Sequence, residues 1–258
     1  MSELFTYSDL VTAWRCPRRW YYERQGWRPL ETPEAMLRGT LVHKAVEAWH
    51  NKQEIAAALK AVIDEEMEHR PVDKREGLTE LAMTAYNLFV RYRDIYLGDL
   101  QVLQAEKLVT LGSKNKELRV GGTPDLIARH KDKLVLIEIK TGEKSDPEML
   151  DISAQGDYYA YLMGQLGIEI DLLYIDHVTD KYLTRYERPP RLKIGEWFFD
   201  DLLAHIAEEP VADNFPQPAW DCYRCPFLSP CRVRDSNGDD LEILSNGSWY
   251  LDTSRMKR

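Results

Sequence analysis

Two short segments in the middle of the chain place carboxylates close to a lysine. They read Gly-Thr-Pro-Asp at 122–125 and Glu-Ile-Lys at 138–140. Glu138 and Lys140 alternate along a very apolar strand that the sequence predicts at 133–140, so their side chains share one face. An adjacent antiparallel strand ending near Asp125 would bring a second carboxylate beside Glu138.

These residue types suit metal-assisted hydrolysis of a phosphodiester bond. Clustered carboxylates bind a hard divalent cation through oxygen. Lys140 beside them can position or activate a water molecule and stabilise charge on a phosphate. The alternative interpretation is a buried Glu–Lys ion pair with an unrelated turn aspartate. Glu106, on the preceding predicted strand, is a further candidate for this site.

Two weaker motifs flank this pair of segments. Gly39-x3-His43 lies on a helix predicted at 33–50. His43 is a candidate fourth metal ligand, and a mixed nitrogen and oxygen site tolerates Mn²⁺ better than Mg²⁺. The alternative is a structural histidine.

Gln155-x3-Tyr159 lies on a helix predicted at 148–166, with one helical turn between the two residues. Two polar side chains on one helix face can orient Lys140, a water molecule or a backbone phosphate. Packing in an aromatic core is the alternative for Tyr159.

Four cysteines form a one-plus-three pattern, with Cys16 near the start and Cys222, Cys225 and Cys231 near the end. The short spacing of the last three suits thiolates that converge on one centre. Zinc and a 4Fe–4S cluster both take four cysteines, and spacing alone does not separate them. Four unrelated buried thiols are the remaining alternative.

The elements that must position these residues follow a clear order along the chain. A polar stretch from Arg70 to Gly77 separates two of the predicted helices, and a hairpin is centred on Gly112 to Lys116. Helices are predicted at 8–24 with Ser8 as N-cap and a break at Pro17, and at 33–50, 53–69, 78–97, 148–166 and about 193–208; strands are predicted at 101–111, 117–129, 133–140, 169–176 and 181–187. The tail from Asp235 is polar and predicted to be loosely held. One α/β core with a helical insertion and a terminal cysteine-bound lobe fits this order best.

The composition is that of an ordinary globular protein. The chain has 258 residues, of which 44% are hydrophobic and 30% charged, with a net charge of −9. No apolar run reaches the ~20 residues of a membrane span, and no secretory signal opens the sequence. We therefore expect a cytoplasmic protein, or a viral protein acting in the host cytoplasm, without a membrane partner.

The acidic balance argues against a protein that coats nucleic acid indiscriminately. Basic and aromatic residues nevertheless alternate near the N-terminus: Trp14, Arg15, Arg18, Arg19, Trp20, Tyr21, Tyr22, Arg24, Trp27 and Arg28. Arginine and aromatic side chains hold phosphates and stack bases. A solvated basic helix face is the alternative for each arginine.

In chain order, the motifs Gly-x3-His, Gly-x2-Asp, Glu-x-Lys and Gln-x3-Tyr resemble the RecB-like branch of the PD-(D/E)XK nucleases. Pro124-Asp125 matches the pair that names the superfamily, and Tyr7, Ser8 and the string at 16–21 look like the branch's opening helix. The resemblance covers about 6–231, apart from a helical insertion at about 52–100. It implies an α/β restriction-endonuclease-like core, with a mixed central sheet flanked by helices, an N-terminal helical region and a cysteine-bound C-terminal lobe. A single domain at 1–232 and a polar tail at 233–258 follow.

The resemblance also implies roles for individual residues. His43, Asp125 and Glu138, helped by the Ile139 carbonyl, would hold Mg²⁺ or Mn²⁺. Lys140 would serve the nucleophilic water, and Gln155 and Tyr159 would support the substrate side. The cysteine pattern looks like that of iron–sulfur RecB-like nucleases, including AddB-type nuclease domains and CRISPR-associated exonucleases of the Cas-four type. It therefore implies a 4Fe–4S cluster, with zinc as the alternative, on Cys16, Cys222, Cys225 and Cys231.

The expected activity is that of a DNA exonuclease acting on single strands or DNA ends. Recombination, repair, phage DNA metabolism and CRISPR spacer processing are all compatible settings. The sequence contains no Walker A motif, so a helicase would be a separate partner. The main rival is a catalytically silent DNA-binding or assembly module that retains the fold.

Overall fold

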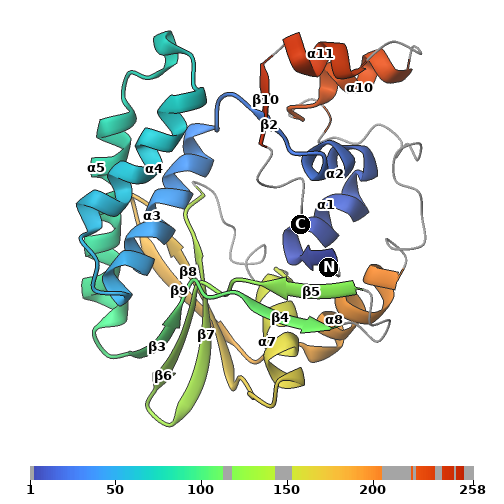
Figure 1. Cartoon of the computed structure of the whole chain (residues 1–258). Helices are drawn as coiled ribbons and strands as arrows, with labels where there is room; N and C mark the ends of the chain where they lie inside the picture. The colour runs from blue at the N-terminus through green and yellow to red at the C-terminus, as the bar shows by residue number, and fades with distance from the viewer. Residues whose placement is uncertain are drawn as a thin grey trace.

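A computed structural model describes residues 3–112, 118–142, 153–204, 222, 225–235, 240–246 and 248–252. Its centre is a five-stranded sheet in the order β3-β6-β7-β8-β9 (Figure 1). The strands are β3 (Gln101–Ala105), β6 (Leu126–His130), β7 (Lys133–Lys140), β8 (Leu172–Val178) and β9 (Leu183–Arg188). β7 and β8 are parallel, whereas the other neighbours are antiparallel, so the sheet is mixed as predicted.

Strand β7 lies in the middle of the sheet and is covered on both faces. Val135, Ile137 and Ile139 join a buried cluster with the helices of one layer, and Leu136 joins the cluster on the opposite face. The first layer comprises α3 (Glu34–His50), α4 (Ile55–His69) and α5 (Leu78–Tyr92), on the left in Figure 1. The predicted alternation of side chains between the two faces of this strand is therefore confirmed. Glu138 and Lys140 lie on the same face as Leu136.

The second face of the sheet is covered by α7 (Gln155–Gln165), α8 (Leu192–Glu196) and a π-helical turn, η3 (Trp197–Leu202). The predicted helices in these regions are confirmed from 155 to 165 and from 192 to 204; residues 143–152 and 205–221 lie outside the described residues. A short 3₁₀ helix, η1 (Val72–Lys74), separates α4 from α5, and a π-helical turn, η2 (Arg93–Leu97), extends α5.

The two long strands predicted at 101–111 and 117–129 are each divided in the structure, and that prediction is wrong in this respect. The pieces β4 (Val109–Gly112) and β5 (Leu118–Gly122) leave the central sheet and pair with β1 (Glu3–Thr6) in a second sheet of order β1-β5-β4. The first break falls at Glu106, whose φ is +47°, and the second at Thr123-Pro124-Asp125. The Glu106 amide donates to the Asp125 carbonyl at 3.0 Å, which joins the two breaks.

The N-terminal helix breaks at Pro17, as predicted, into α1 (Tyr7–Arg15) and α2 (Pro17–Arg24). The predicted cap, Ser8, is wrong. Thr6 caps α1 instead, because its hydroxyl accepts from the Asp9 amide and the Asp9 carboxylate accepts from the Thr6 amide. Cys16 ends α1 and caps α2, where its sulfur accepts from the Arg19 amide.

The C-terminal segment returns to the N-terminal helices. It forms α10 (Leu228–Asp235), α11 (Asp240–Asn246) and β10 (Trp249–Leu251), and β10 pairs antiparallel with β2 (Trp27–Pro29). Leu244 is fully buried against Tyr22 and Phe227. The predicted loosely held tail is therefore wrong for the described residues from 240 to 252, because burial and strand pairing fix this polar-looking segment. Within the described part of the chain, no helix has the length and apolarity to cross a membrane.

Candidate active site

Asp125 and Glu138 meet because β6 and β7 are antiparallel neighbours. Leu126 pairs with Ile137, so Asp125, one residue before β6, lies beside Glu138 on β7. The Ile139 amide donates to Asp125 Oδ2 at 2.5 Å, which fixes the carboxylate against the Glu138–Lys140 segment. Both carboxylates are buried, with 4% and 1% of their residue surface exposed. The sequence-based prediction that these two carboxylates lie together is confirmed.

His43 and Glu106 complete a set of metal-type ligands around Asp125. His43 Nδ1 lies 2.8 Å from Glu106 Oε1 and 3.4 Å from Asp125 Oδ1. One ligand atom from each residue lies within 4.8 Å of the others, and no other group this close was found in the described ranges. Glu138 is adjacent but does not belong to this three-residue set. Glu106, predicted from the sequence only as a further candidate, therefore belongs to the candidate metal site.

Electrostatics at the site are dominated by burial and by carboxylate charge. Burial would lower the pKa of His43, but Asp125 and Glu106 outweigh it and raise that pKa well above its usual value. Burial tends to raise the pKa of Asp125, but His43 outweighs it and lowers that pKa. Burial, reinforced by the charge on Asp125, raises the pKa of Glu138 to about 8.

The site fits a bound divalent cation. Glu138 Oε1 is buried and has no hydrogen-bond partner within the described residues, so a strong acceptor is left without a donor. Carboxylate oxygens with one imidazole suit Mg²⁺ and, better, Mn²⁺. A hollow of about 510 Å³ opens beside these groups; its lining includes Thr32, Met36, Gly39, Thr40, His43, Lys44, Glu47 and Glu106. The hollow therefore reaches the candidate site at His43 and Glu106.

Lys140 lies at the centre of a hydrogen-bond chain that reaches α7. Its Nζ lies 3.1 Å from Glu138 Oε2 and donates to Gln155 Oε1 at 2.6 Å. Gln155 Nε2 in turn donates to the Tyr159 hydroxyl at 3.2 Å. Burial would lower the pKa of Lys140, but Glu138 and Asp125 outweigh it, so the ammonium stays charged. The structure therefore brings both helical residues predicted from the Gln-x3-Tyr motif to Lys140.

The glycines of the motifs permit close approaches. A Cβ added at Gly122 would lie 2.1 Å from Tyr159 Cε1, and one at Gly39 would lie 2.9 Å from Thr141 Oγ1. Any larger side chain at Gly122 would push the Tyr159 ring away from its hydrogen bond with Gln155. The Gly-x2-Asp and Gln-x3-Tyr motifs are therefore in direct contact, through Gly122 and the Tyr159 ring.

Several supporting residues escaped the sequence analysis. Arg188 and Arg191 both donate to the carboxylate of Asp157, which is fully buried on α7, and to the Ser153 carbonyl two residues before Gln155. These contacts hold the start of α7, and therefore Gln155, against the end of β9. The sequence does show Asp157 as a charged residue among apolar ones. It does not show its partners, because Arg188 and Arg191 are 31 and 34 positions away.

The loop after β7 is also held by residues that the sequence analysis did not select. Arg38 Nη2 donates to the Thr141 carbonyl at 3.3 Å, and His177 Nε2 contacts the Gly142 carbonyl. Arg38 and His43 both lie on α3. This helix therefore holds the loop after β7 through Arg38 and supplies a metal-type ligand through His43. Ile139 contacts Asp125 through its amide, and the role expected for its carbonyl stays a prediction.

The N-terminal and C-terminal cysteines lie in the same region of the molecule. Burial raises the pKa of the Cys16 thiol, and nearby Cys222 contributes to the rise; burial likewise raises the pKa of Cys225, with contributions from Cys16 and Cys222. Cys231 Sγ lies 3.7 Å from Arg18 Nη1 on α2. No disulfide joins these four cysteines. Within the described ranges, their sulfurs do not gather as closely as the His43 ligand set.

The fold and this site define an α/β protein with the carboxylate and lysine groups of a metal-dependent nuclease. A family model described as the PD-(D/E)XK nuclease superfamily matches residues 4–232. The chain therefore belongs to the PD-(D/E)XK nuclease superfamily, whose members use divalent metals and act on nucleic acid.

Other comparisons add less. No curated protein matched the sequence. A solved structure described as "Crystal structure of SSO0001" shares 16% sequence identity, over 89% of this chain and 85% of the other, with a TM-score of 0.44.

Proposed function

We propose that this chain is a DNA exonuclease of the RecB-like branch that acts on single strands or DNA ends. The carrying observation is the position of Lys140, which is hydrogen-bonded to Gln155 and ion-paired with Glu138 beside the His43, Glu106 and Asp125 set. A half-buried lysine next to a cation site is the equipment for attack on a phosphodiester. The exonuclease assignment rests on the ordered motifs of the sequence.

Each residue has a distinct task in this proposal. His43, Asp125 and Glu138, with the Ile139 carbonyl and Glu106, would hold Mg²⁺ or Mn²⁺, which when bound lowers the pKa of water and neutralises phosphate charge. The Lys140 ammonium orients the attacking water and stabilises negative charge on the phosphate. Gln155 Oε1 accepts from the Lys140 ammonium and holds it in place, and the Tyr159 hydroxyl accepts from Gln155 Nε2 and anchors the other end of the amide.

We also propose a 4Fe–4S cluster on Cys16, Cys222, Cys225 and Cys231. It is supported by the mutual proximity of Cys16, Cys222 and Cys225 across the length of the chain. A cluster there would join α1 and α2 to the C-terminal lobe. The lobe already contacts the N-terminal region, because its strand β10 pairs with β2. A separate helicase or another recombination or CRISPR protein would be the partner in the cell.

The rival function is a silent DNA-binding module with the same fold. The complete Asp125, Glu138 and Lys140 set opposes it, because a binding module has no need for a lysine held against a buried carboxylate.

The test is digestion of end-labelled single-stranded and double-stranded DNA in Mn²⁺, Mg²⁺, Ca²⁺ or chelator. We expect activity in Mn²⁺ at least equal to that in Mg²⁺, and none in Ca²⁺ or chelator. Asp125→Ala, Glu138→Ala and Lys140→Ala should each abolish cleavage while the fold survives, and combining them should add little, because the residues act as a unit. Lys60→Ala, in an exposed ion pair on α4, is the matched control and should digest like the wild type. Cleavage by all three variants, or in excess chelator, would overturn the metal mechanism, and DNA binding without cleavage by the wild type would leave the binding module.

A further inference from the structure

A series of ring contacts links the candidate active site to the molecular surface; Tyr159 and Phe198 within it are buried, and its outer end is exposed. Tyr159, the partner of Gln155, lies 6.5 Å from Tyr7 between ring centroids. Tyr7 lies 5.2 Å from Phe198, Phe198 lies 5.0 Å from Trp197, and Trp197 lies 5.8 Å from Trp14. We call Tyr7, Phe198, Trp197 and Trp14 the aromatic track. It is built by one edge of α1 and by η3, which pack against each other.

The outer end of the track exposes large apolar surface. Trp14 is 57% exposed and Trp197 is 38% exposed, and their rings meet edge to face at 89°. Two adjacent tryptophans on a surface leave much apolar area in water, which folding alone does not require. Their perpendicular arrangement still leaves ring surface available for contact with another flat group.

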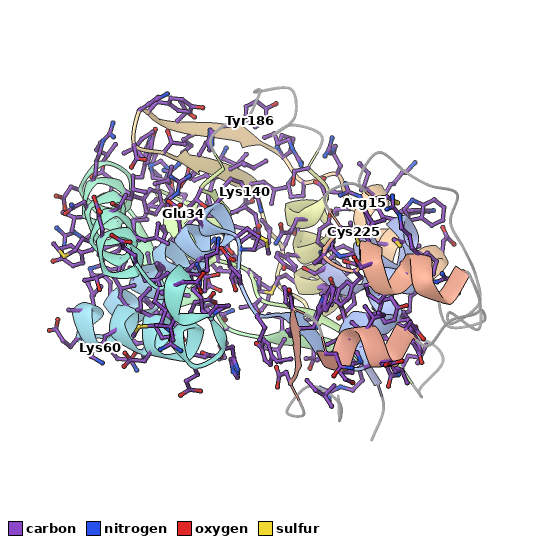
Figure 2. All side chains as sticks on the ribbon, turned by 90° about the horizontal axis from the view of Figure 1, so that it is seen from above. Arg15, Glu34, Lys60, Lys140, Tyr186 and Cys225 are labelled. Atoms are coloured by element: carbon purple, nitrogen blue, oxygen red, sulfur yellow. The ribbon has the colours of Figure 1, made fainter. Side chains whose placement is uncertain are left out.

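Positive charge accompanies the track at both ends. The charges of Lys140 and of Arg15 both act on the Tyr7 hydroxyl, which places both cations near this residue. Arg15 is exposed and directly follows Trp14 on α1. Figure 2 shows Lys140 between the α3–α5 layer, which carries Lys60, and the N-terminal helices, which carry Arg15. The exposed tryptophan pair therefore lies beside one cation, Arg15, and is linked through Tyr7 to the other, Lys140.

We propose that the exposed end of the aromatic track, Trp14 and Trp197, binds the single-stranded part of the substrate near the cleaved phosphate. Trp14 and Trp197 stack on its bases, and Arg15 contacts its backbone. Base–aromatic stacking tolerates any sequence, because every base has a flat face. Paired bases in a duplex are already stacked on each other, so the track selects single strands or frayed ends. This inference rests on the proposed nuclease function and specifies its substrate.

Charge and position favour DNA over a protein partner as the occupant. Arg15 and Lys140 both lie near Tyr7, so the exposed tryptophans lie on the side of the molecule where a strand held at Lys140 would emerge. The exposed aromatic pair and the neighbouring Arg15 match the two components of a nucleic-acid strand, which are apolar base faces and an anionic backbone.

The experiment measures binding of labelled oligo(dT) of about 16 nucleotides by fluorescence anisotropy, in Ca²⁺ to prevent cleavage. Trp14→Ala and Trp197→Ala should each weaken binding by roughly 5- to 150-fold, the range for one lost base stack. Trp14→Phe should retain most of the affinity because it keeps a flat ring. Tyr86→Ala on α5, also a 38% exposed aromatic residue, is the control and should bind like the wild type.

Two further measurements make the outcome specific to DNA. Affinity for a blunt duplex should change much less than affinity for the single strand in both tryptophan variants. Arg15→Gln should lower the slope of log affinity against log salt by about 0.7, the contribution of one phosphate contact on a single strand.

The outcomes separate this inference from the proposed function. If the wild type cleaves DNA but folded Trp14→Ala and Trp197→Ala proteins bind oligo(dT) normally, the track is not a DNA site and the nuclease stands. If the tryptophan variants lose single-strand and duplex affinity equally, the track does not select single strands. If the wild type neither binds nor cleaves DNA, the proposed function itself fails.

Discussion

Metal binding at the candidate active site should strengthen steeply with pH because of Glu138. Its carboxylate is buried, its Oε1 is unpaired within the described residues, and burial with the charge on Asp125 raises its pKa to about 8. A carboxyl group must lose its proton to bind a cation. For a ligand of pKa about 8, Mn²⁺ affinity should rise roughly 50-fold between about pH 6 and about pH 8. His43, whose pKa is also raised, would make the dependence steeper if its ring binds the ion.

Isothermal titration calorimetry with Mn²⁺ measures this dependence. Titrations in two buffers with different ionisation enthalpies should show release of about one proton or more per ion near pH 6. Glu138→Gln is the informative variant, because it keeps the shape but removes the titration. It should bind Mn²⁺ more weakly at pH 8 and lose most of the pH dependence. Equal affinity of the wild type at both pH values, with no proton release, would refute the reasoning.

The same shift has the opposite consequence for the metal-free protein. The pKa of Glu138 is higher in the folded chain than its usual value of 4.5, so the folded state binds this proton more tightly than the unfolded state. Its contribution to stability is complete below about pH 4.5 and is lost as the pH rises to about 8. Thermal melts in chelator should therefore show a wild-type Tm that falls over this window more than that of Glu138→Gln.

Two further predictions concern packing and the cysteines. Gly122→Ala should destabilise the fold by about 1–3 kcal/mol and reduce cleavage, because its Cβ would lie 2.1 Å from the Tyr159 ring, whereas Gly112→Ala on the neighbouring strand meets nothing within 4 Å and should melt like the wild type; equal Tm values for both variants would contradict this contact. Protein purified without oxygen should contain about four irons per chain and absorb blue light. Cys16→Ser should lower the iron content, and a colourless wild type with one zinc would show that the cofactor is not an iron–sulfur cluster.

Local sequence patterns determined the parts of the site that lie within one element. The alternation along 133–140 put Glu138 and Lys140 on one face, and β7 has those bounds. The spacing of Gln155 and Tyr159 put both on one face of α7, where they are hydrogen-bonded. These predictions succeed because a strand repeats every two residues and a helix about every 3.6, so spacing alone decides which side chains are neighbours.

Tertiary structure decided the contacts between distant segments. Glu106 joins His43 and Asp125 because the chain turns at a positive φ where β3 ends, and no periodicity signals that corner. The described residues of the polar tail from 240 to 252 are held in place because β10 pairs with β2 and Leu244 packs against Tyr22. The aromatic track likewise needs α1 and η3 to meet. Such contacts depend on how whole elements pack, and apolar burial is not directional, so one sequence without its fold cannot specify them.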